Sequence, residues 1–169
     1  MSSLQFIKKQ SASDVTAIEV TDCFNENYDL YKVCITKTDV TVQTYSYIRL
    51  LDSNNNDIGD AEYKYAQGDY PANAHLVGGQ SSSANFLCAN IDISGTDLKK
   101  GIGQTFWVHR PYNSDSYTYA QGQSSGYTTI GYMTAWYGVH ASLETIKGIR
   151  YYRGSGNFDS VEVVVYGVK

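Results

Sequence analysis

The chain has 169 residues, sixteen of them tyrosine, and a formal net charge of −4 at pH 7. This length suffices for one domain with its own core, and the acidic balance lacks the basic footprint by which proteins displace counterions from nucleic acid. No segment approaches the roughly 18 apolar residues of a membrane span, and the N-terminus does not resemble a signal peptide. We therefore expect a protein made in a reducing cytoplasm that binds no nucleic acid and inserts in no membrane.

Strand patterns dominate the first part of the chain. A run at residues 17–22 is followed by one at 29–37, in which Tyr31, Val33 and Ile35 alternate with other residues. This period of two indicates one buried and one exposed face. A third strand is expected at 42–52 and ends in a turn at 52–57, across which a short strand at 62–65 is expected to pair back.

The middle of the chain has weaker patterns. Residues 68–84 are rich in Gly, Ser and Asn and predict a long surface loop. Alternating apolar residues predict strands at 87–93 and at 104–110. Residues 111–126 are polar and aromatic and are interpreted as a loop, and the strand pattern resumes at 127–136.

The C-terminal segment contains two β-rich runs, 145–153 and 159–169, around a Gly/Ser/Asn turn, which predicts a β-hairpin. Eight or nine short strands with long polar connections predict an all-β, single-domain antiparallel β-sandwich that is jelly-roll-like. The alternating runs supply the expected core residues: Tyr31, Val33, Ile35, Leu87, Ala89, Ile91, Phe106, Val108, Ile130, Val163 and Val165.

Metal and disulfide chemistry find little support in the sequence. The cysteines at 23, 34 and 88 are odd in number and irregularly spaced, which fits neither a disulfide framework nor a zinc site. Cys34 and Cys88 lie in apolar strand patterns and are expected to be buried. Residues 52–59 faintly resemble a calcium loop, but Asp57 replaces the turn glycine and Tyr63 the closing glutamate. A hairpin turn explains the segment better, and we expect no metal and no cofactor.

Catalytic chemistry finds little support in the sequence. His75, His109 and His140 lie far apart, and there is no phosphate-binding loop. Paired carboxylates for glycoside hydrolysis stay open because their separation is spatial, although the acidic residues lie mostly in turns. We expect a protein that is not an enzyme.

The segment 111–127 is the best candidate binding region. Tyr112, Tyr117 and Tyr119 lie among Ser, Gly, Asn and Gln. This combination provides rigid amphipathic contact area beside adaptable hydrogen-bonding groups, and aromatic rings also stack on sugar faces. Two interpretations stay open: these tyrosines bind a ligand, or they pack the loop onto its own sandwich.

The segment 1–14 is expected to be a docking arm or an added strand. Leu4, Phe6 and Ile7 precede the first core strand, and apolar side chains of this kind are enriched where proteins meet. The alternative is that they simply pack on the protein's own sheet.

Several segments form an ordered pattern along the chain. It opens with a short strand-like segment at 4–9 and continues with 17–24, a Tyr-Asp-x-Tyr strand at 28–33 and an Arg-Leu-x-Asp strand at 47–52. It closes with 146–151, Gly-Asn-Phe at 156–158 and Tyr-Gly-Val at 166–168. Taken in this order, the segments resemble small virion structural and accessory proteins of tailed phages, of the marine and cyanobacterial type. The match covers both ends of the chain and leaves about residues 66–144 unassigned. The resemblance implies a β-sandwich virion protein without catalysis or cofactor, and it transfers no site residues.

Proteins of this type serve as head decorations or as parts of a tail fibre or receptor-binding tip. We expect a capsid decoration or knob-type protein docked on the virion surface. The alternative is a tail module that recognises a host surface glycan, and a third hypothesis is a non-viral carbohydrate-binding or hydrolase accessory domain. The expected partners are major capsid or tail proteins, further copies of the chain in a homo-oligomer, and a host surface glycan for the tail module.

Overall fold

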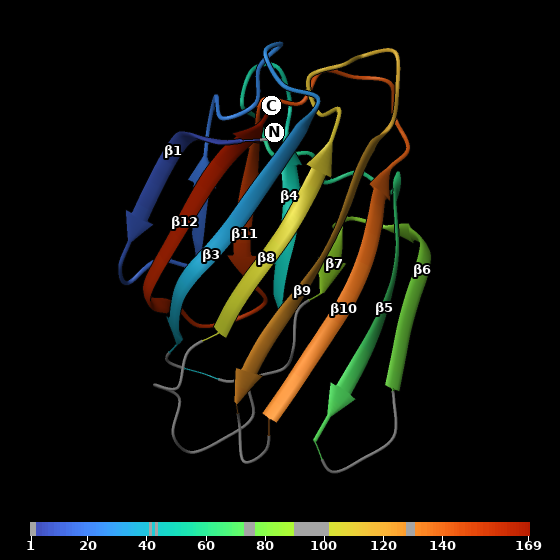
Figure 1. Cartoon of the computed structure of the whole chain (residues 1–169). Helices are drawn as coiled ribbons and strands as arrows, with labels where there is room; N and C mark the ends of the chain where they lie inside the picture. Colours follow the sequence, from blue (N-terminus) through green and yellow to red (C-terminus); the bar gives the residue numbers. More distant parts are fainter. Residues whose placement is uncertain (1–2, 41, 43, 73–76, 90–101, 128–130) are drawn as a thin grey trace.

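The chain forms two stacked antiparallel β-sheets (Figure 1). The computed structural model describes residues 3–40, 42, 44–72, 77–89, 102–127 and 131–169. The larger sheet has eight strands in the spatial order β1 (Leu4–Ala12), β12 (Phe158–Val168), β3 (Leu30–Val40), β8 (Ile102–His109), β9 (Thr118–Tyr127), β10 (Gly131–His140), β5 (Tyr63–Pro71) and β6 (Val77–Ala84). The smaller sheet has four, in the order β2 (Ala17–Val20), β11 (Gly148–Arg153), β4 (Ser46–Leu51) and β7 (Cys88–Ala89).

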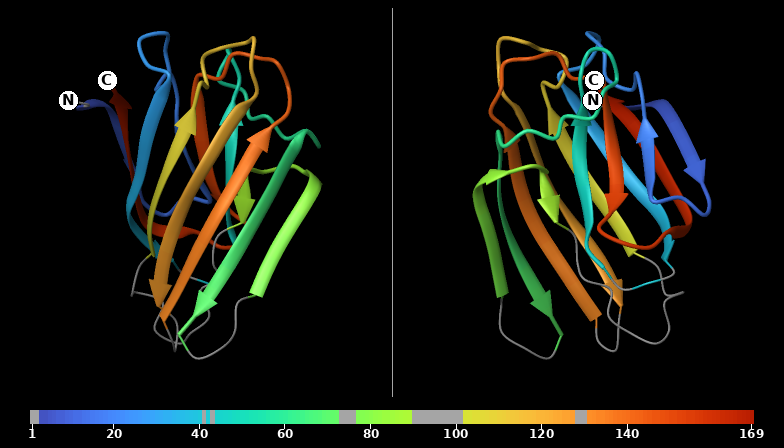
Figure 2. Two further views of the ribbon diagram at one scale, coloured as in Figure 1. Left: turned by 45° about the vertical axis from the view of Figure 1, so that its right-hand side comes forward. Right: turned by 180° about the vertical axis from the view of Figure 1, so that it is seen from behind.

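The predicted fold class, an all-β antiparallel sandwich of jelly-roll type, is confirmed. Figure 2 shows the two layers from the side and from behind, with the small sheet covering part of the large one. The described residues contain twelve strands rather than the eight or nine expected. They contain no helix that is long and apolar enough to cross a membrane.

The additional strands lie in segments that sequence composition assigned to loops. Residues 68–84 contribute the end of β5 and the whole of β6, which pair with each other from Asp69↔Val77 to Tyr63↔Ala84. The short strand expected at 62–65 is the start of β5, and it pairs with β10 and β6 rather than back onto β4. Likewise, 118–127 forms β9 in the middle of the large sheet. The loop prediction is therefore wrong for β5 and β6 within 68–84 and for 118–126 within 111–126, because pairing with a neighbouring strand satisfies the backbone whatever the side-chain propensity.

The predicted C-terminal hairpin is also wrong. β11 pairs with β2 and β4 in the small sheet, whereas β12 pairs with β1 and β3 in the large sheet. The turn at 154–157 therefore carries the chain from one layer to the other. Both strands bury apolar side chains between the layers, and Tyr151 of β11 stacks on Phe158 of β12 with ring centroids 5.0 Å apart.

The core lies between the two sheets and contains most of the predicted residues. Fully buried members of the predicted set are Tyr31, Val33, Ile35, Leu87, Phe106, Val108, Val163 and Val165. Burying side chains of this size contributes about 1.5–3 kcal/mol each relative to exposure. Ile91 and Ile130 lie outside the described residues, as does the side chain of Ala89. Cys34 is only half buried because it alternates with Val33 and Ile35, so the expectation that it is buried is wrong; Cys23 is buried instead.

The N-terminal segment forms an edge strand. β1 pairs antiparallel with β12 from Leu4↔Val168 to Ala12↔Val161, which is the added-strand alternative for residues 1–14. Ile7 is partly buried against the core, whereas Leu4 and Phe6 are 49% and 63% exposed. The segment is thus part of the sheet, and two of its three apolar candidates still face solvent.

Candidate functional site

The outer face of the large sheet carries a row of paired residues that crosses every strand and includes four aromatic side chains. Successive residues of a strand point to opposite faces, so residues paired across strands share a face. Following the pairing from β1 to β6 gives what we call the aromatic row: Phe6, Tyr166, Lys32, Trp107, Gln121, Tyr137, Ala66 and Gln80. At about 4.8 Å per strand the row is ~34 Å long. It is long enough for an extended ligand to contact several strands at once.

Neighbouring members of the aromatic row contact one another. Phe6 and Tyr166 meet edge to face with centroids 6.2 Å apart. The Lys32 ammonium lies 5.7 Å from the centroid of the Trp107 ring. Tyr137, two strands further on, is 48% exposed. The row therefore offers planar surfaces at intervals, with a cation beside the largest of them.

A shallow groove runs beside the aromatic row. The adjacent row on the same face is made of small and polar residues: Thr105, Gln123, Ala135, Gly68 and Gly78. The next outward row contains larger side chains again, among them Met133 and Tyr70. Small residues between larger ones leave a hollow along the sheet, and we call this space, with its two flanking rows, the outer-face groove.

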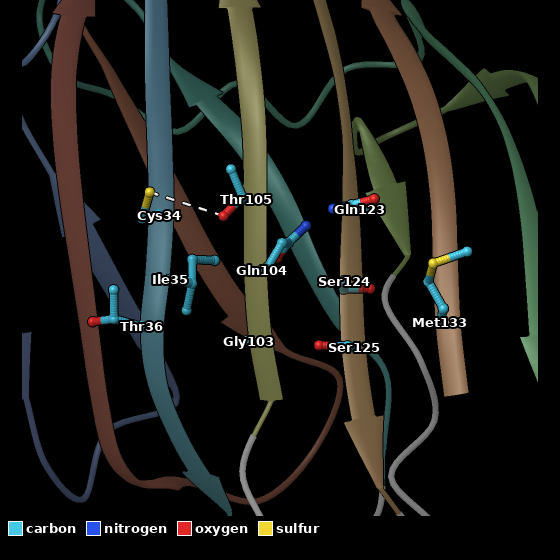
Figure 3. A pocket seen from close by; sticks show the side chains of 10 residues that line it. All are labelled: Cys34, Ile35, Thr36, Gly103, Gln104, Thr105, Gln123, Ser124, Ser125 and Met133. Atoms are coloured by element: carbon cyan, nitrogen blue, oxygen red, sulfur yellow. Dashed lines mark hydrogen bonds between the residues drawn. The ribbon is translucent and has the colours of Figure 1, made fainter. Parts of the chain in front are cut away.

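Two hollows occupy the outer-face groove over β3, β8, β9 and β10. One of about 400 Å³ reaches from Cys34 and Thr105 to Met133 (Figure 3). The other, of about 440 Å³, lies against Trp107, Gln121 and Ala135. Thr105 Oγ1 is 3.9 Å from Cys34 Sγ, a weak contact that leaves the hydroxyl available to a ligand. A third hollow, of about 560 Å³, lies beyond Tyr137.

The groove is lined by side chains that can form hydrogen bonds with a ligand. Amide side chains of Gln121 and Gln123 and the hydroxyl of Thr105 can donate and accept hydrogen bonds. Among the described residues, the outward positions of β8, β9, β10 and β5 hold no carboxylate. A pair of carboxylates of the kind that hydrolyses glycosidic bonds is therefore missing from this part of the face.

The three tyrosines proposed from sequence do not form one site. Tyr112 lies half-buried in the turn after β8, and Tyr117 is exposed just before β9. Tyr119 lies on β9, opposite His109 and on the same outer face as the aromatic row. The structure places Tyr119 two residues along β9 from Gln121 and leaves the other two at the end of the sandwich.

Trp107, Gln121, Tyr137 and Lys32 were missed by reasoning from sequence. A signal for Trp107 was present, since it lies between Phe106 and Val108 and must therefore point away from the core. A large aromatic side chain on the solvent face of a predicted strand suggests a binding role. Tyr137 was missed because the predicted strand ended at residue 136.

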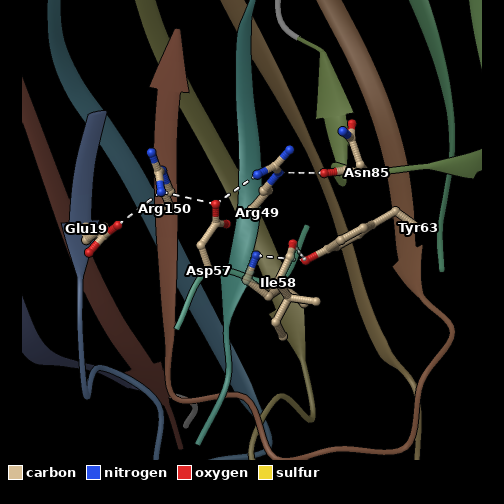
Figure 4. A network of polar contacts seen from close by, with 8 residues as sticks. Glu19, Arg49, Asp57, Ile58, Tyr63, Asn85 and Arg150 are labelled. Atoms are coloured by element: carbon tan, nitrogen blue, oxygen red, sulfur yellow. Dashed lines mark hydrogen bonds and ion pairs between the residues drawn. The ribbon is translucent and has the colours of Figure 1, made fainter. Parts of the chain in front are cut away.

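A second polar cluster lies on the outer face of the small sheet, where Arg49 and Arg150 are directly opposite each other (Figure 4). Such like charges repel, but Asp57 Oδ2 accepts hydrogen bonds from Arg49 Nη1 at 2.8 Å and Arg150 Nη1 at 3.1 Å. Glu19 Oε1 lies 3.5 Å from Arg150 Nη1. Two cations and two anions therefore balance within the cluster.

Beneath this cluster, the buried hydroxyl of Tyr63 links β4 to the segment that follows it (Figure 4). The hydroxyl accepts a hydrogen bond from the Leu50 amide and donates one to the Ile58 carbonyl, each at 3.1 Å. Burial raises the pKa of Tyr63, so the phenol stays protonated and remains a donor.

One group of metal-ligand residue types comes together in the described part of the chain. The ligand atoms of Asp60, His140 and Glu144 lie within 4.8 Å of one another. Asp60 Oδ1 lies 3.2 Å from Nε2 of the buried imidazole, and Glu144 Oε1 lies 3.6 Å from Nδ1. The two carboxylates approach opposite nitrogens of the ring, so the imidazole lies between them. The three groups therefore do not converge on one metal ion.

The 52–59 segment is a turn stabilised by its own carboxylate. Asp52 accepts hydrogen bonds from the backbone N–H groups of Asn54 and Asn56 at 2.7 and 2.8 Å, and from the Asn56 side chain at 3.0 Å. The Asn56 backbone bond, supported by the other two, lowers the pKa of Asp52. The interpretation as a turn rather than a calcium loop agrees with this geometry.

Comparisons with known proteins concern the fold alone. No family model and no curated protein matches the chain. Among solved structures it is similar to an exo-inulinase from Aspergillus awamori, at 11% identity and TM-score 0.48, over 97% of this chain and 29% of the enzyme, so it spans less than a third of that protein. It is also similar to the Caenorhabditis elegans galectin LEC-6, at 10% identity and TM-score 0.33, over 94% and 95% of the two chains. A third similarity is to the CBM2 module of the evolved Dit of Lactobacillus casei BL23 phage J-1, at 9% identity and TM-score 0.30, over 93% and 74%.

Proposed function

We propose that this chain is a non-catalytic recognition module of a tailed-phage particle that binds a host surface glycan in the outer-face groove. The glycan assignment is supported by the aromatic row beside a groove of small and polar side chains. The phage assignment is supported by the sequence resemblance at both ends of the chain. In this proposal the protein acts by adhesion, as part of the virion, and requires no cofactor.

The observation that carries the glycan proposal is the placement of Trp107 and Tyr137 in one outward row, two strands apart. Sugar rings present an apolar face that stacks on aromatic rings and a polar edge that needs hydrogen-bonding partners. Gln121 lies between the two aromatic residues and supplies an amide at that edge. The same row thus offers both kinds of contact that a sugar chain needs.

The test is a glycan array followed by titration of the best hit. Tyr137→Ala and Trp107→Ala are expected to weaken binding by roughly tenfold or more, since an aromatic contact contributes about 0.5–1.5 kcal/mol beyond its buried area. The matched control is Tyr45→Ala, because Tyr45 is 45% exposed, close to the 48% of Tyr137, but is remote from the groove. Absence of any hit, or equal binding by all variants, would contradict the proposal.

The second candidate function is capsid decoration, and the observation that favours it is the exposed apolar edge of β1. Leu4 and Phe6 remain 49% and 63% exposed after the sheet has formed. Side chains of this kind are suited to contact with a capsid or tail protein. Copy number distinguishes the two locations, because a shell requires hundreds of copies per particle and a tail requires few. Quantitative mass spectrometry of purified particles measures it.

A further inference from the structure

We infer that the ligand of the outer-face groove is a carboxylated glycan, and that Lys32 recognises its carboxylate beside a sugar ring stacked on Trp107. This inference rests on the proposed glycan binding and adds the chemical class of the sugar. The observations behind it are the distribution of charge on the outer face and the geometry of the pair formed by Lys32 and Trp107.

The charge on this face is opposite in sign to that of the whole protein. The chain has 17 acidic against 13 basic residues. In the described part of the molecule, the outward positions of β8, β9, β10 and β5 contain Lys64 and His109 but no carboxylate. Lys32 of β3 adds a second lysine, which lies in the aromatic row beside Trp107 and four strands from Lys64. An acidic protein with a locally cationic binding face is suited to an anionic ligand.

The carboxylates that do occur near this face are already engaged elsewhere. Glu162 on β12 pairs with Lys9 at 2.6 Å. Asp69 on β5 lies on the inward-facing side, where it accepts a hydrogen bond from Thr134 Oγ1 at 2.6 Å. Among the described ion pairs none includes Lys32. The Lys32 ammonium therefore has no carboxylate of its own to neutralise it.

The position of Lys32 matches the shape of a carboxylated sugar. Its ammonium lies 5.7 Å from the Trp107 ring centroid, at the distance of a cation–π contact. A sugar that stacks on the indole has its ring substituents at the rim, and a carboxylate there comes within reach of the flexible lysine stem. Gln121, on the other side of Trp107, can bond ring hydroxyls. The arrangement selects a charged ring over a neutral ring of the same shape.

The probe is a galacturonic acid hexamer, compared with the same hexamer after methyl esterification, which removes the charge and keeps the rings. Wild-type protein is expected to bind the acid form roughly tenfold more tightly than the ester at low ionic strength. This preference is expected to shrink in about 0.5 M NaCl, where the Debye length falls to a few ångströms. Isothermal titration calorimetry measures all four conditions.

Variants distinguish the contribution of the Lys32 charge to binding from that of the Trp107 ring. Lys32→Met removes the charge but keeps an unbranched stem over the indole, and is expected to bring the affinity for the acid form down to that for the ester. Trp107→Ala is expected to weaken both ligands, with a thermal melt to verify folding. Lys37→Met, which removes an exposed lysine on the same strand, is the matched control and is expected to behave as wild type.

The possible outcomes distinguish failure of the inference about carboxylated sugars from failure of the proposed glycan binding. Equal affinity for acid and ester, or a preference that survives Lys32→Met, overturns the inference about carboxylated sugars and leaves glycan binding standing. If neither hexamer binds but a neutral glycan from the array does, the inference is again overturned and the proposed function stands. If no glycan of any class binds, both are overturned.

Discussion

At the scale of single residues, Gly122 allows the core to pack closely behind the outer-face groove. It lies on the inward side of β9, between Phe106 of β8 and Trp136 of β10, whose rings are 5.4 Å apart. A Cβ added at Gly122 would lie 2.3 Å from the Phe106 Cβ and 2.5 Å from the Thr105 carbonyl oxygen. The glycine therefore lets two large rings close over the strand that carries Gln121 and Gln123.

We predict that Gly122→Ala destabilises the protein by about 1–3 kcal/mol or more, because the added methyl group forces backbone and ring to shift in a packed core. Gly103→Ala is the control. Its added Cβ meets one atom, the Ser125 hydroxyl oxygen at 3.9 Å, which is ordinary contact. It should change the free energy of unfolding by at most about 0.5 kcal/mol. Urea denaturation of both variants measures the difference, and equal stability would show that the core adapts at Gly122.

At the scale of secondary-structure elements, one carboxylate holds three strands of the large sheet together. Glu162 on β12 forms an ion pair with Lys9 of β1 at 2.6 Å and accepts hydrogen bonds from Thr36 of β3 at 2.8 Å and Ser11 of β1 at 3.3 Å. The hydrogen bond from Lys9, followed by that from Thr36, lowers the pKa of Glu162. Among the described strands, β1 is an edge strand that pairs with β12.

The lowered pKa of Glu162 predicts that the attachment of β1 to the sheet becomes weaker in acid. A carboxyl group whose pKa is lower in the folded than in the unfolded protein stabilises the fold above its unfolded pKa of about 4.3, and that contribution is lost as the pH falls through the lowered folded value. Hydrogen-exchange protection of β1 amides is therefore expected to decrease below about pH 4. Glu162→Gln should show reduced protection already at pH 7 and little further pH dependence.

Glu26→Gln is the control for this measurement, since Glu26 is an exposed carboxyl in the loop before β3. Its substitution should leave β1 protection unchanged at both pH values. If β1 stays fully protected in acid, apolar packing of Ile7 and Ala12 against the core holds the strand without help from Glu162.

The elements that sequence could predict are those whose two faces differ in polarity. β3 was predicted from the alternation of Tyr31, Val33 and Ile35, because one face is buried in the core. β6 and β9 could not be predicted in this way, since both of their faces carry small and polar residues. What makes them strands is backbone pairing with adjacent strands, such as Ala135↔Gln123 between β10 and β9. The terminal hairpin failed for a related reason: local sequence does not reveal which sheet a strand joins.

The candidate site was predictable only in part for the same reason. Tyr119 was found because it lies in an obviously aromatic segment. The pairing of Trp107 with Lys32 and Gln121 arises from the order β3-β8-β9, which joins residues more than seventy positions apart in the case of Lys32 and Trp107. Register between distant strands is not encoded in any local pattern.

At the scale of the whole molecule, the outer-face groove is open, and this limits the affinity of a single copy. Its aromatic side chains are exposed and the hollows of about 400 and 440 Å³ are shallow parts of a sheet surface. A ligand there stays partly hydrated, and each aromatic contact contributes about 0.5–1.5 kcal/mol beyond its buried area. A particle that carries several copies would instead bind through many weak contacts at once.

We therefore predict that binding depends strongly on valency. Fusion of the chain to a trimerising coiled coil is expected to raise apparent affinity for a glycan-coated surface by about 10²–10⁴, provided that the grooves reach neighbouring sugars together. Surface plasmon resonance at high and low glycan density measures this, because the gain should vanish when the sugars are too sparse to be bridged. A trimer of the Trp107→Ala variant is the control and should gain little. If the wild-type trimer gains no more than the threefold expected from counting sites, each copy acts alone, and adhesion would have to come from a tighter contact than the exposed aromatic row provides.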